Sequence, residues 1–329
     1  MRVAGIDCGT NTIRLLIAEV PGESGAPLTD VAREMEVVRL GQGVDRTGRF
    51  DPESLRRTLE MVDQFAAKCR DAGVESIRFA ATSATRDAAN RQEFIDGVRE
   101  RLGIEPQVIS GRQEASLSFA GAISVLPADS PSPLIAIDLG GGSTELALGT
   151  SDGEVLQAFS MNVGSVRMRE RHLLSDPPTP SQVAAAREDV NAALDEAEKH
   201  VDLSAARGVI GLAGTVTTVT AQALGLDSYQ PERIHGAQLS LKQIEETCQW
   251  FIEAPFALRG TPGYMHPGRV DVIGAGALVW WEVVKRIAQR TADARQPVTH
   301  VVTSEHDILD GLALWAAGEP QTPNVATRR

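Results

Sequence analysis

One short strand–turn–strand pattern occurs twice in the sequence, and this repeat constrains the fold more than any other feature. The first copy reads IDCGTNT from Ile6, and the second reads IDLGGGS from Ile137. Asp138 follows Asp7 by 131 residues, which is close to the length of an ordinary domain. A unit that recurs at domain spacing predicts two α/β domains built on the same plan.

Strands and helices alternate around both copies. A helix is predicted to begin at Asp51-Pro52-Glu53, with a capping aspartate and a proline in its first turn, and to end at Gly73. A buried helix rich in small residues is predicted over 270–288. The run PADSPSP at 127–133 is the clearest break in composition, so it is the best candidate for a domain boundary.

Composition narrows the classes of function. The formal net charge is −12, whereas a protein that binds nucleic acid through its general field would be basic. The three cysteines show no paired spacing, and no apolar stretch reaches the roughly 18–20 residues that span a bilayer. We therefore expect a cytoplasmic protein that binds neither nucleic acid nor membrane, and that holds any anionic substrate by local features.

The second turn has the chemistry of a phosphate-binding loop. Gly140, Gly141 and Gly142 have no side chains to block close approach and readily adopt positive φ, so their N–H groups can wrap a phosphate oxygen. Ser143 adds a hydroxyl donor. The alternative is an ordinary glycine hairpin, which the repeat at Asp7 makes less favourable.

Two acids flank this turn. Asp138 ends the strand before it, where a carboxylate can hold a hydrated divalent cation. Glu145 lies two residues after Ser143, so the pleat keeps both side chains on one face. The pair Asp138 and Glu145, and less directly Asp7, are the candidate metal ligands.

The first turn offers a complementary set of donors. Asp7, Thr10, Asn11 and Thr12 supply one acid with hydroxyl and amide groups. Facing the second turn, they would clamp a phosphate chain from the other side.

Two strand-to-helix turns are further candidates. Gly214 and Thr215 stand where helix N–H groups can meet an anion, although a threonine-capped turn explains them equally well. Arg86 follows a similar turn and can contact phosphate in a fork, or it is a solvated arginine.

Glu114 is the candidate base, because a carboxylate near the start of a helix can orient and deprotonate water. The alternative is a partner of the helix dipole. No HExxH, GxSxG, GxxxxGK[ST] or GxGxxG pattern occurs, which argues against histidine metal sites, serine hydrolases, Walker NTPases and dinucleotide enzymes.

Taken together, the motifs resemble those of the exopolyphosphatase / guanosine pentaphosphate phosphatase (Ppx/GppA) family, within the actin–sugar kinase–Hsp70 superfamily. The chain looks most like its short, two-domain actinobacterial members. The matching segments run nearly end to end in the family's order: GIDCGTNTIRLLIAEV, ATSATRDAAN, VISGRQEASLSFAGA, IDLGGGSTELALG, GLAGTVTT, HPGRVDVIGAGA and SEHDILDGLAL.

The resemblance implies an α/β fold of two ribonuclease-H-like domains of the actin-like ATPase superfamily, with an interdomain active-site cleft. The domains expected are 1–126, joined by a C-terminal helix at about 304–319, and 127–303. It also implies Mg²⁺ or Mn²⁺ as cofactor and a homodimer.

The resemblance assigns roles to the candidate residues. Glu114 would activate water, and Asp138 and Glu145 would be the acids at the metal and phosphate site. The residues implied to contact phosphate are Asp7, Thr10, Asn11, Thr12, Arg86, Gly140, Gly141, Gly142, Ser143, Gly214, Thr215 and Arg269.

The activity implied is release of orthophosphate from the end of inorganic polyphosphate. The same residues would serve to remove the terminal phosphate of guanosine pentaphosphate, the stringent-response nucleotide. A kinase of the same superfamily and a non-catalytic nucleotide-responsive regulator are further alternatives. Because the sequence ends soon after the closing helix, short polyphosphates are plausible substrates.

Overall fold

The computed structural model describes residues 1–21, 28–123, 126 and 130–318. The chain divides into two units, residues 1–124 with 308–329, and residues 125–307. Part of the predicted boundary, residues 127–129, lies outside the described residues. The closing helix α13 (Ile308–Ala316) groups with the first unit, whereas residues 304–307 group with the second.

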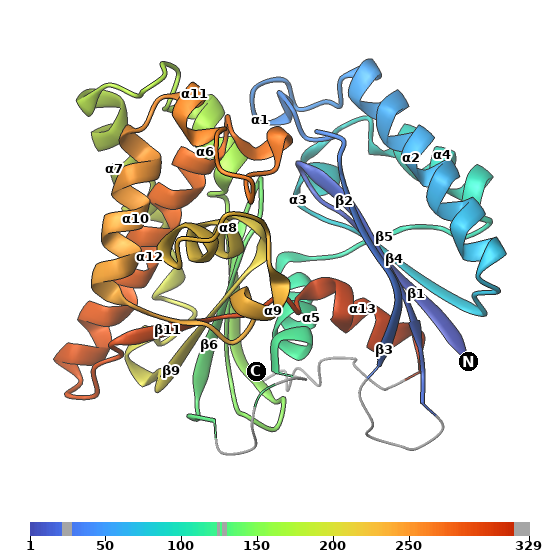
Figure 1. The fold of residues 1–329 in the computed structure, drawn as a ribbon. Helices are drawn as coiled ribbons and strands as arrows, with labels where there is room; N and C mark the ends of the chain where they lie inside the picture. The colour runs from blue at the N-terminus through green and yellow to red at the C-terminus, as the bar shows by residue number, and fades with distance from the viewer. Residues whose placement is uncertain (22–27, 124–125, 127–129, 319–329) are drawn as a thin grey trace. The chain divides into compact units, whose positions relative to one another are not determined.

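The first unit is built on a five-stranded sheet in the order β3-β2-β1-β4-β5 (Figure 1). Neighbours β1, β2 and β3 are antiparallel, and β4 and β5 continue the sheet in parallel with β1. The strands are β1 (Arg2–Cys8), β2 (Thr12–Glu19), β3 (Thr29–Val37), β4 (Ser76–Ala81) and β5 (Gln107–Val108).

Helices cover both faces of this sheet. One face packs against α2 and α4, and the other against α5 and α13. The helices of the unit are α1 (Val44–Thr47), α2 (Pro52–Asp71), α3 (Ser83–Asp87), α4 (Arg91–Leu102), α5 (Gly111–Ile123) and α13. The predicted start of α2 is confirmed, because the Asp51 carboxylate accepts from the N–H groups of Glu53 and Ser54.

The second unit repeats the plan. Its sheet has the order β10-β11-β9-β6-β7-β8, in which β6, β7 and β8 are antiparallel and β9 lies parallel to β6. The strands are β6 (Leu134–Leu139), β7 (Thr144–Gly149), β8 (Val155–Met161), β9 (Gly208–Leu212), β10 (Gln238–Ser240) and β11 (His300–Thr303). The strand–turn–strand repeat is therefore the central hairpin of each sheet.

One hydrophobic core joins the helices of the second unit, except α11 (Phe256–Arg259) and η2 (Pro267–Arg269), to its sheet. The other helices of the unit are α6 (Ser165–Arg171), α7 (Pro180–Ala197), η1 (Leu203–Ala205), α8 (Ala213–Ala223), α9 (Pro231–Ile234), α10 (Leu241–Glu253) and α12 (Ile273–Asp293). The predicted buried helix corresponds to α12. Its small residues allow close packing, since a Cβ at Gly276 would lie 2.5 Å from Thr215 Oγ1.

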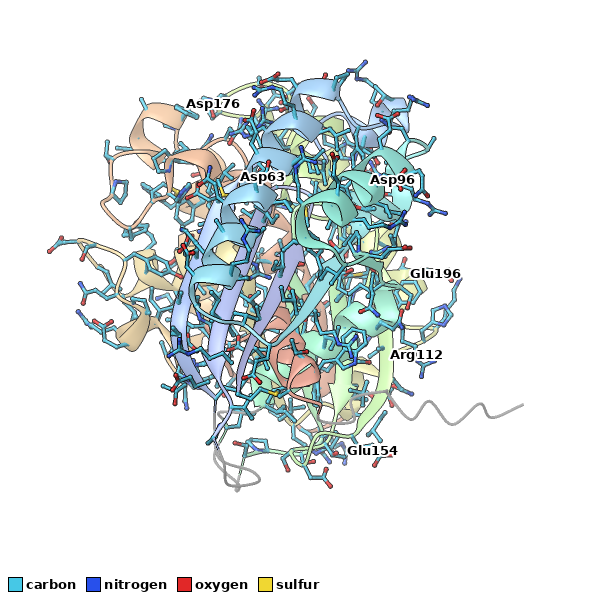
Figure 2. All side chains as sticks on the ribbon, turned by 90° about the vertical axis from the view of Figure 1, so that its right-hand side faces the viewer. Asp63, Asp96, Arg112, Glu154, Asp176 and Glu196 are labelled. Carbon is cyan, nitrogen blue, oxygen red and sulfur yellow. The ribbon has the colours of Figure 1, made fainter. Side chains whose placement is uncertain are left out.

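Charged side chains lie on the outer surfaces of the helices, as Figure 2 shows for Asp63 on α2 and Asp96 on α4. Arg101 Nε lies 3.0 Å from Asp63 Oδ2, which links α4 to α2. No helix in the described part of the chain is both long enough and apolar enough to cross a bilayer.

Candidate active site

The β1–β2 hairpin places an aspartate opposite an arginine. Asp7 and Arg14 are direct cross-strand neighbours. The Nε and Nη2 atoms of Arg14 donate to Asp7 Oδ2 at 3.0 and 2.7 Å, and Asp7 is only 5% exposed. Burial, with the nearby Asp7 charge, raises the pKa of the Cys8 thiol well above its usual value. Arg14 therefore places a positive charge beside Asp7, one of the candidate metal ligands.

The turn after β1 is tied to its surroundings by backbone bonds. The Gly9 N–H donates to the Thr12 carbonyl, and the Asn11 carbonyl accepts from the N–H groups of Val38 and Arg39. The buried hydroxyls of Thr10 and Ser83 share a hydrogen bond of 3.0 Å. The Thr10 hydroxyl is thus directed toward α3.

Within the first unit, Glu114 and Arg86 are in direct contact. Arg86 Nη1 donates to Glu114 Oε2 at 2.6 Å and to the Ile109 carbonyl at 3.0 Å. Glu114 lies in the first turn of α5 and is 7% exposed. The start of α5 is held by Ser110 and Gln113, whose side chains bond each other's backbone N–H in the manner of a capping box. The sequence offered both residues as candidates but did not predict their pairing, which orients the carboxylate and keeps a positive charge beside it.

The β6–β7 hairpin places two acids opposite each other. Asp138 and Glu145 are direct cross-strand partners, 7% and 2% exposed. Ser160, the neighbour of Glu145 on β8, donates its hydroxyl to Glu145 Oε1 at 2.7 Å. Like charges directly opposite repel, so a cation near this pair would be stabilising.

The donor set suits a hard divalent cation. Among the described residues, no group of three or more His, Cys, Asp or Glu side chains could hold a metal ion. Mg²⁺, however, is commonly bound through one or two carboxylates, with water and substrate phosphate completing its shell. Asp138 and Glu145 fit that requirement.

The glycine turn differs from the expectation in one respect. None of Gly140, Gly141 and Gly142 is among the positive-φ glycines of the described chain, so the expectation of left-handed backbone there was wrong. Close packing is the observed constraint: a Cβ at Gly164 would lie 2.7 Å from the Gly141 carbonyl and the Ser143 nitrogen. In the part of the chain that the structure describes, the N–H groups of Gly141 and Gly142 have no protein acceptor.

A third turn lies at the start of α8. The helix begins at Ala213, whose φ of 68° is left-handed, so Gly214 and Thr215 lie in its first turn rather than before it. Arg269 covers Gly214, because a Cβ there would lie 2.1 Å from Arg269 Nη2. The Nη1 atom of Arg269 donates to Thr218 Oγ1 at 2.9 Å.

Sequence reasoning missed Arg14, Ser160 and Arg167, which all contact predicted residues. Arg167, on α6, donates its Nε to the Gly142 carbonyl at 2.6 Å. For Arg14 a signal existed: it precedes Glu145 by 131 residues, the spacing of the repeat. The contacts of Ser160 and Arg167 depend on packing that the repeat does not encode.

Comparisons with known proteins agree with this architecture. Residues 16–297 match the model of the Ppx/GppA phosphatase family. Exopolyphosphatase 2 of Mycobacterium tuberculosis is 44% identical over 323 residues, covering 96% of this chain and 99% of the relative. The crystal structure of an exopolyphosphatase-like protein matches with a TM-score of 0.92 and 44% identity over 97% of this chain and 99% of that one. The Aquifex aeolicus PPX-GPPA enzyme matches with a TM-score of 0.75 and 28% identity, over 94% and 98% respectively.

Proposed function

Because the chain belongs to the Ppx/GppA phosphatase family, we propose that it is an exopolyphosphatase. It hydrolyses the terminal phosphoanhydride bond of inorganic polyphosphate and releases orthophosphate. The observation that carries the proposal is the end of the β6–β7 hairpin, where a buried carboxylate pair adjoins a turn with two uncommitted backbone N–H groups among the described residues. A cation and the phosphate it neutralises can be bound there together.

In the proposed reaction, Glu114 orients a water molecule and accepts its proton. The water oxygen attacks the terminal phosphorus, and the bond from that phosphorus to the bridging oxygen breaks. The shortened chain leaves with the bridging oxygen. Phosphoryl transfer requires mainly positioning and charge neutralisation from the protein. A carboxylate held in place by Arg86 is therefore sufficient as the base.

Asp138 and Glu145 would hold Mg²⁺ or Mn²⁺, which would supply positive charge to the phosphate oxygens. The turn of residues 140–143 would bind phosphate through the N–H groups of Gly141, Gly142 and Ser143, since the Gly140 N–H donates to the Ser143 carbonyl. Arg269, beside Gly214, would add a guanidinium. The roles of Asp7, Asn11 and Thr12 at the phosphate chain stay predictions, as do the homodimer and the cytoplasmic location.

Replacing the base tests the mechanism. Glu114→Gln should lower the rate of phosphate release from polyphosphate by at least about 10²-fold, since a positioned base is lost. Glu53→Gln is the matched control, because Glu53 also lies in the first turn of a helix but is exposed. Thermal unfolding of both variants checks that they fold. Near-normal release by folded Glu114→Gln would remove Glu114 from the mechanism.

Substrate choice is tested separately by comparing kcat/KM for polyphosphates of several lengths, guanosine pentaphosphate and ATP. We expect the highest value for polyphosphate. A higher kcat/KM for guanosine pentaphosphate would show that removal of the terminal phosphate of this nucleotide is the main activity instead. The small residues of α12 do not favour a kinase, because Gly274 and Gly276 are accounted for by helix packing.

A further inference from the structure

Helix α6 binds the carbonyl side of the glycine turn. The Ser165 N–H donates to the Gly140 carbonyl at 3.0 Å. The Val166 and Arg167 N–H groups donate to the Gly141 carbonyl at 2.8 and 3.1 Å. The next carbonyl, that of Gly142, accepts from the Arg167 side chain at 2.6 Å. Three successive carbonyls of the turn therefore accept hydrogen bonds from α6.

The geometry of the peptide group also fixes the direction of the N–H groups in this turn. A trans peptide is planar, so its C=O and N–H groups point in opposite directions. Because the carbonyls of residues 140, 141 and 142 point toward α6, the N–H groups of Gly141, Gly142 and Ser143 point away from it. Three consecutive N–H groups on one side form a concavity that suits an anion.

Arg167 bonds the Gly142 carbonyl through its side chain, so no backbone group can replace this contact. Arg167 is 8% exposed, and its guanidinium Nε donates directly to the Gly142 carbonyl. A cation at a carbonyl polarises the peptide, which strengthens the Ser143 N–H as a donor. Gly164 permits the contact, because any side chain there would push α6 away from the turn.

We propose that Arg167 is a positioning residue that, through the Gly142 carbonyl, holds the turn of residues 140–143 in its phosphate-binding conformation. The inference rests on the proposed function only for the identity of the substrate; the ligand class it requires is a phosphoryl group. Arg167 acts from behind the turn and does not itself touch the phosphate.

The test compares Arg167→Met, which removes the donor and the charge, with Arg167→Lys, which keeps the charge and an N–H donor. Arg171→Met is the matched control: Arg171 is on the same helix but pairs with Asp189 at 3.1 Å, away from the turn. Gly164→Ala disturbs the same contact without changing charge. Its backbone is extended, so the substitution adds no backbone strain.

Two readouts separate positioning from simple destabilisation. Steady-state kinetics on polyphosphate should give Arg167→Met a KM raised about tenfold or more, with partial rescue in Arg167→Lys and no change in Arg171→Met. In ¹⁵N-glycine-labelled protein, inorganic orthophosphate should shift the Gly141 and Gly142 amide resonances of the wild type, and shift them much less in Arg167→Met and Gly164→Ala.

The outcomes distinguish this inference from the proposed function. Unchanged KM and unchanged orthophosphate-induced shifts in folded Arg167→Met and Gly164→Ala would overturn the positioning role, even if the wild type hydrolyses polyphosphate. The converse result is a wild type that does not hydrolyse polyphosphate, with orthophosphate shifting the glycine amide resonances of the wild type and Arg167→Lys but not those of Arg167→Met. That result would rule out the proposed activity and support the positioning role. If Arg167→Met does not fold, Gly164→Ala and Arg167→Lys decide by the same measurements.

Discussion

The β1–β2 and β6–β7 hairpins have the same backbone plan but opposite electrostatics. Each carries an aspartate at the end of its first strand, Asp7 in one and Asp138 in the other. The residue directly across from Asp7 is Arg14, whereas the residue across from Asp138 is Glu145. At this position the first hairpin therefore pairs opposite charges, and the second pairs two acids. A single cross-strand position thus changes the local electrostatics of a repeated element.

The turns of the two hairpins differ in a related way. In the first, the Thr10 side chain is buried against Ser83 and the turn bonds the segment that follows β3. In the second, glycines leave the N–H side open while α6 holds the carbonyl side. The second turn is thus the better backbone site for an anion.

Replacing each aspartate with asparagine tests the difference between the two hairpins most directly. Asp138→Asn should lower phosphate release by at least about 10²-fold and raise the Mg²⁺ concentration needed for half-maximal rate, because a proposed metal ligand loses its charge. Asp7→Asn should lower the rate by less than about tenfold and leave the Mg²⁺ dependence unchanged. Equal shifts in Mg²⁺ dependence would contradict the assignment of the metal to the second hairpin alone.

Exchanging the cross-strand partner sharpens the comparison. Arg14→Glu gives the first hairpin the acid pair of the second, so without divalent cations the free energy of unfolding should fall by about 2–4 kcal/mol. Mn²⁺ should raise the melting temperature of this variant by more than it raises that of the wild type. Arg14→Gln, which also loses the ion pair but adds no acid, should show only the wild-type response. If Mn²⁺ raises the melting temperature of both variants equally, the charge of the residue opposite Asp7 does not create a cation site.

The smallest expected effect concerns the strand-to-helix turns. Thr82, before α3, has φ of −110°, whereas Ala213, 131 residues later and opening α8, has φ of 68°. Glycine tolerates that conformation, so Ala213→Gly should raise the free energy of unfolding by about 0.5–1 kcal/mol. Ala221→Gly, in the ordinary helical part of α8, should lower it. Chemical denaturation measures both, and a loss of stability in Ala213→Gly would show that its backbone is not strained.

Much of the candidate site could be predicted because it depends on short-range regularities. The side-chain alternation of a strand put Ser143 and Glu145 on one face once the hairpin turn was recognised. The glycine run predicted a turn with exposed N–H groups, although it misled about φ, since glycine permits positive φ without requiring it. The spacing of the repeat held a signal for Arg14 that sequence reasoning missed, and only strand register reveals that Arg14 faces Asp7.

The sequence by itself determined two α/β units on one plan, the hairpin at the centre of each, and the acids and glycines at their turns. These follow from local periodicity and conformational preference, which act over a few residues. Only the tertiary structure decided that Arg86 bonds Glu114 and that Arg167 holds the Gly142 carbonyl. Those contacts join residues 28 and 25 positions apart, and they arise because the Arg86 side chain extends from α3 to the first turn of α5 and because α6 lies against the glycine turn.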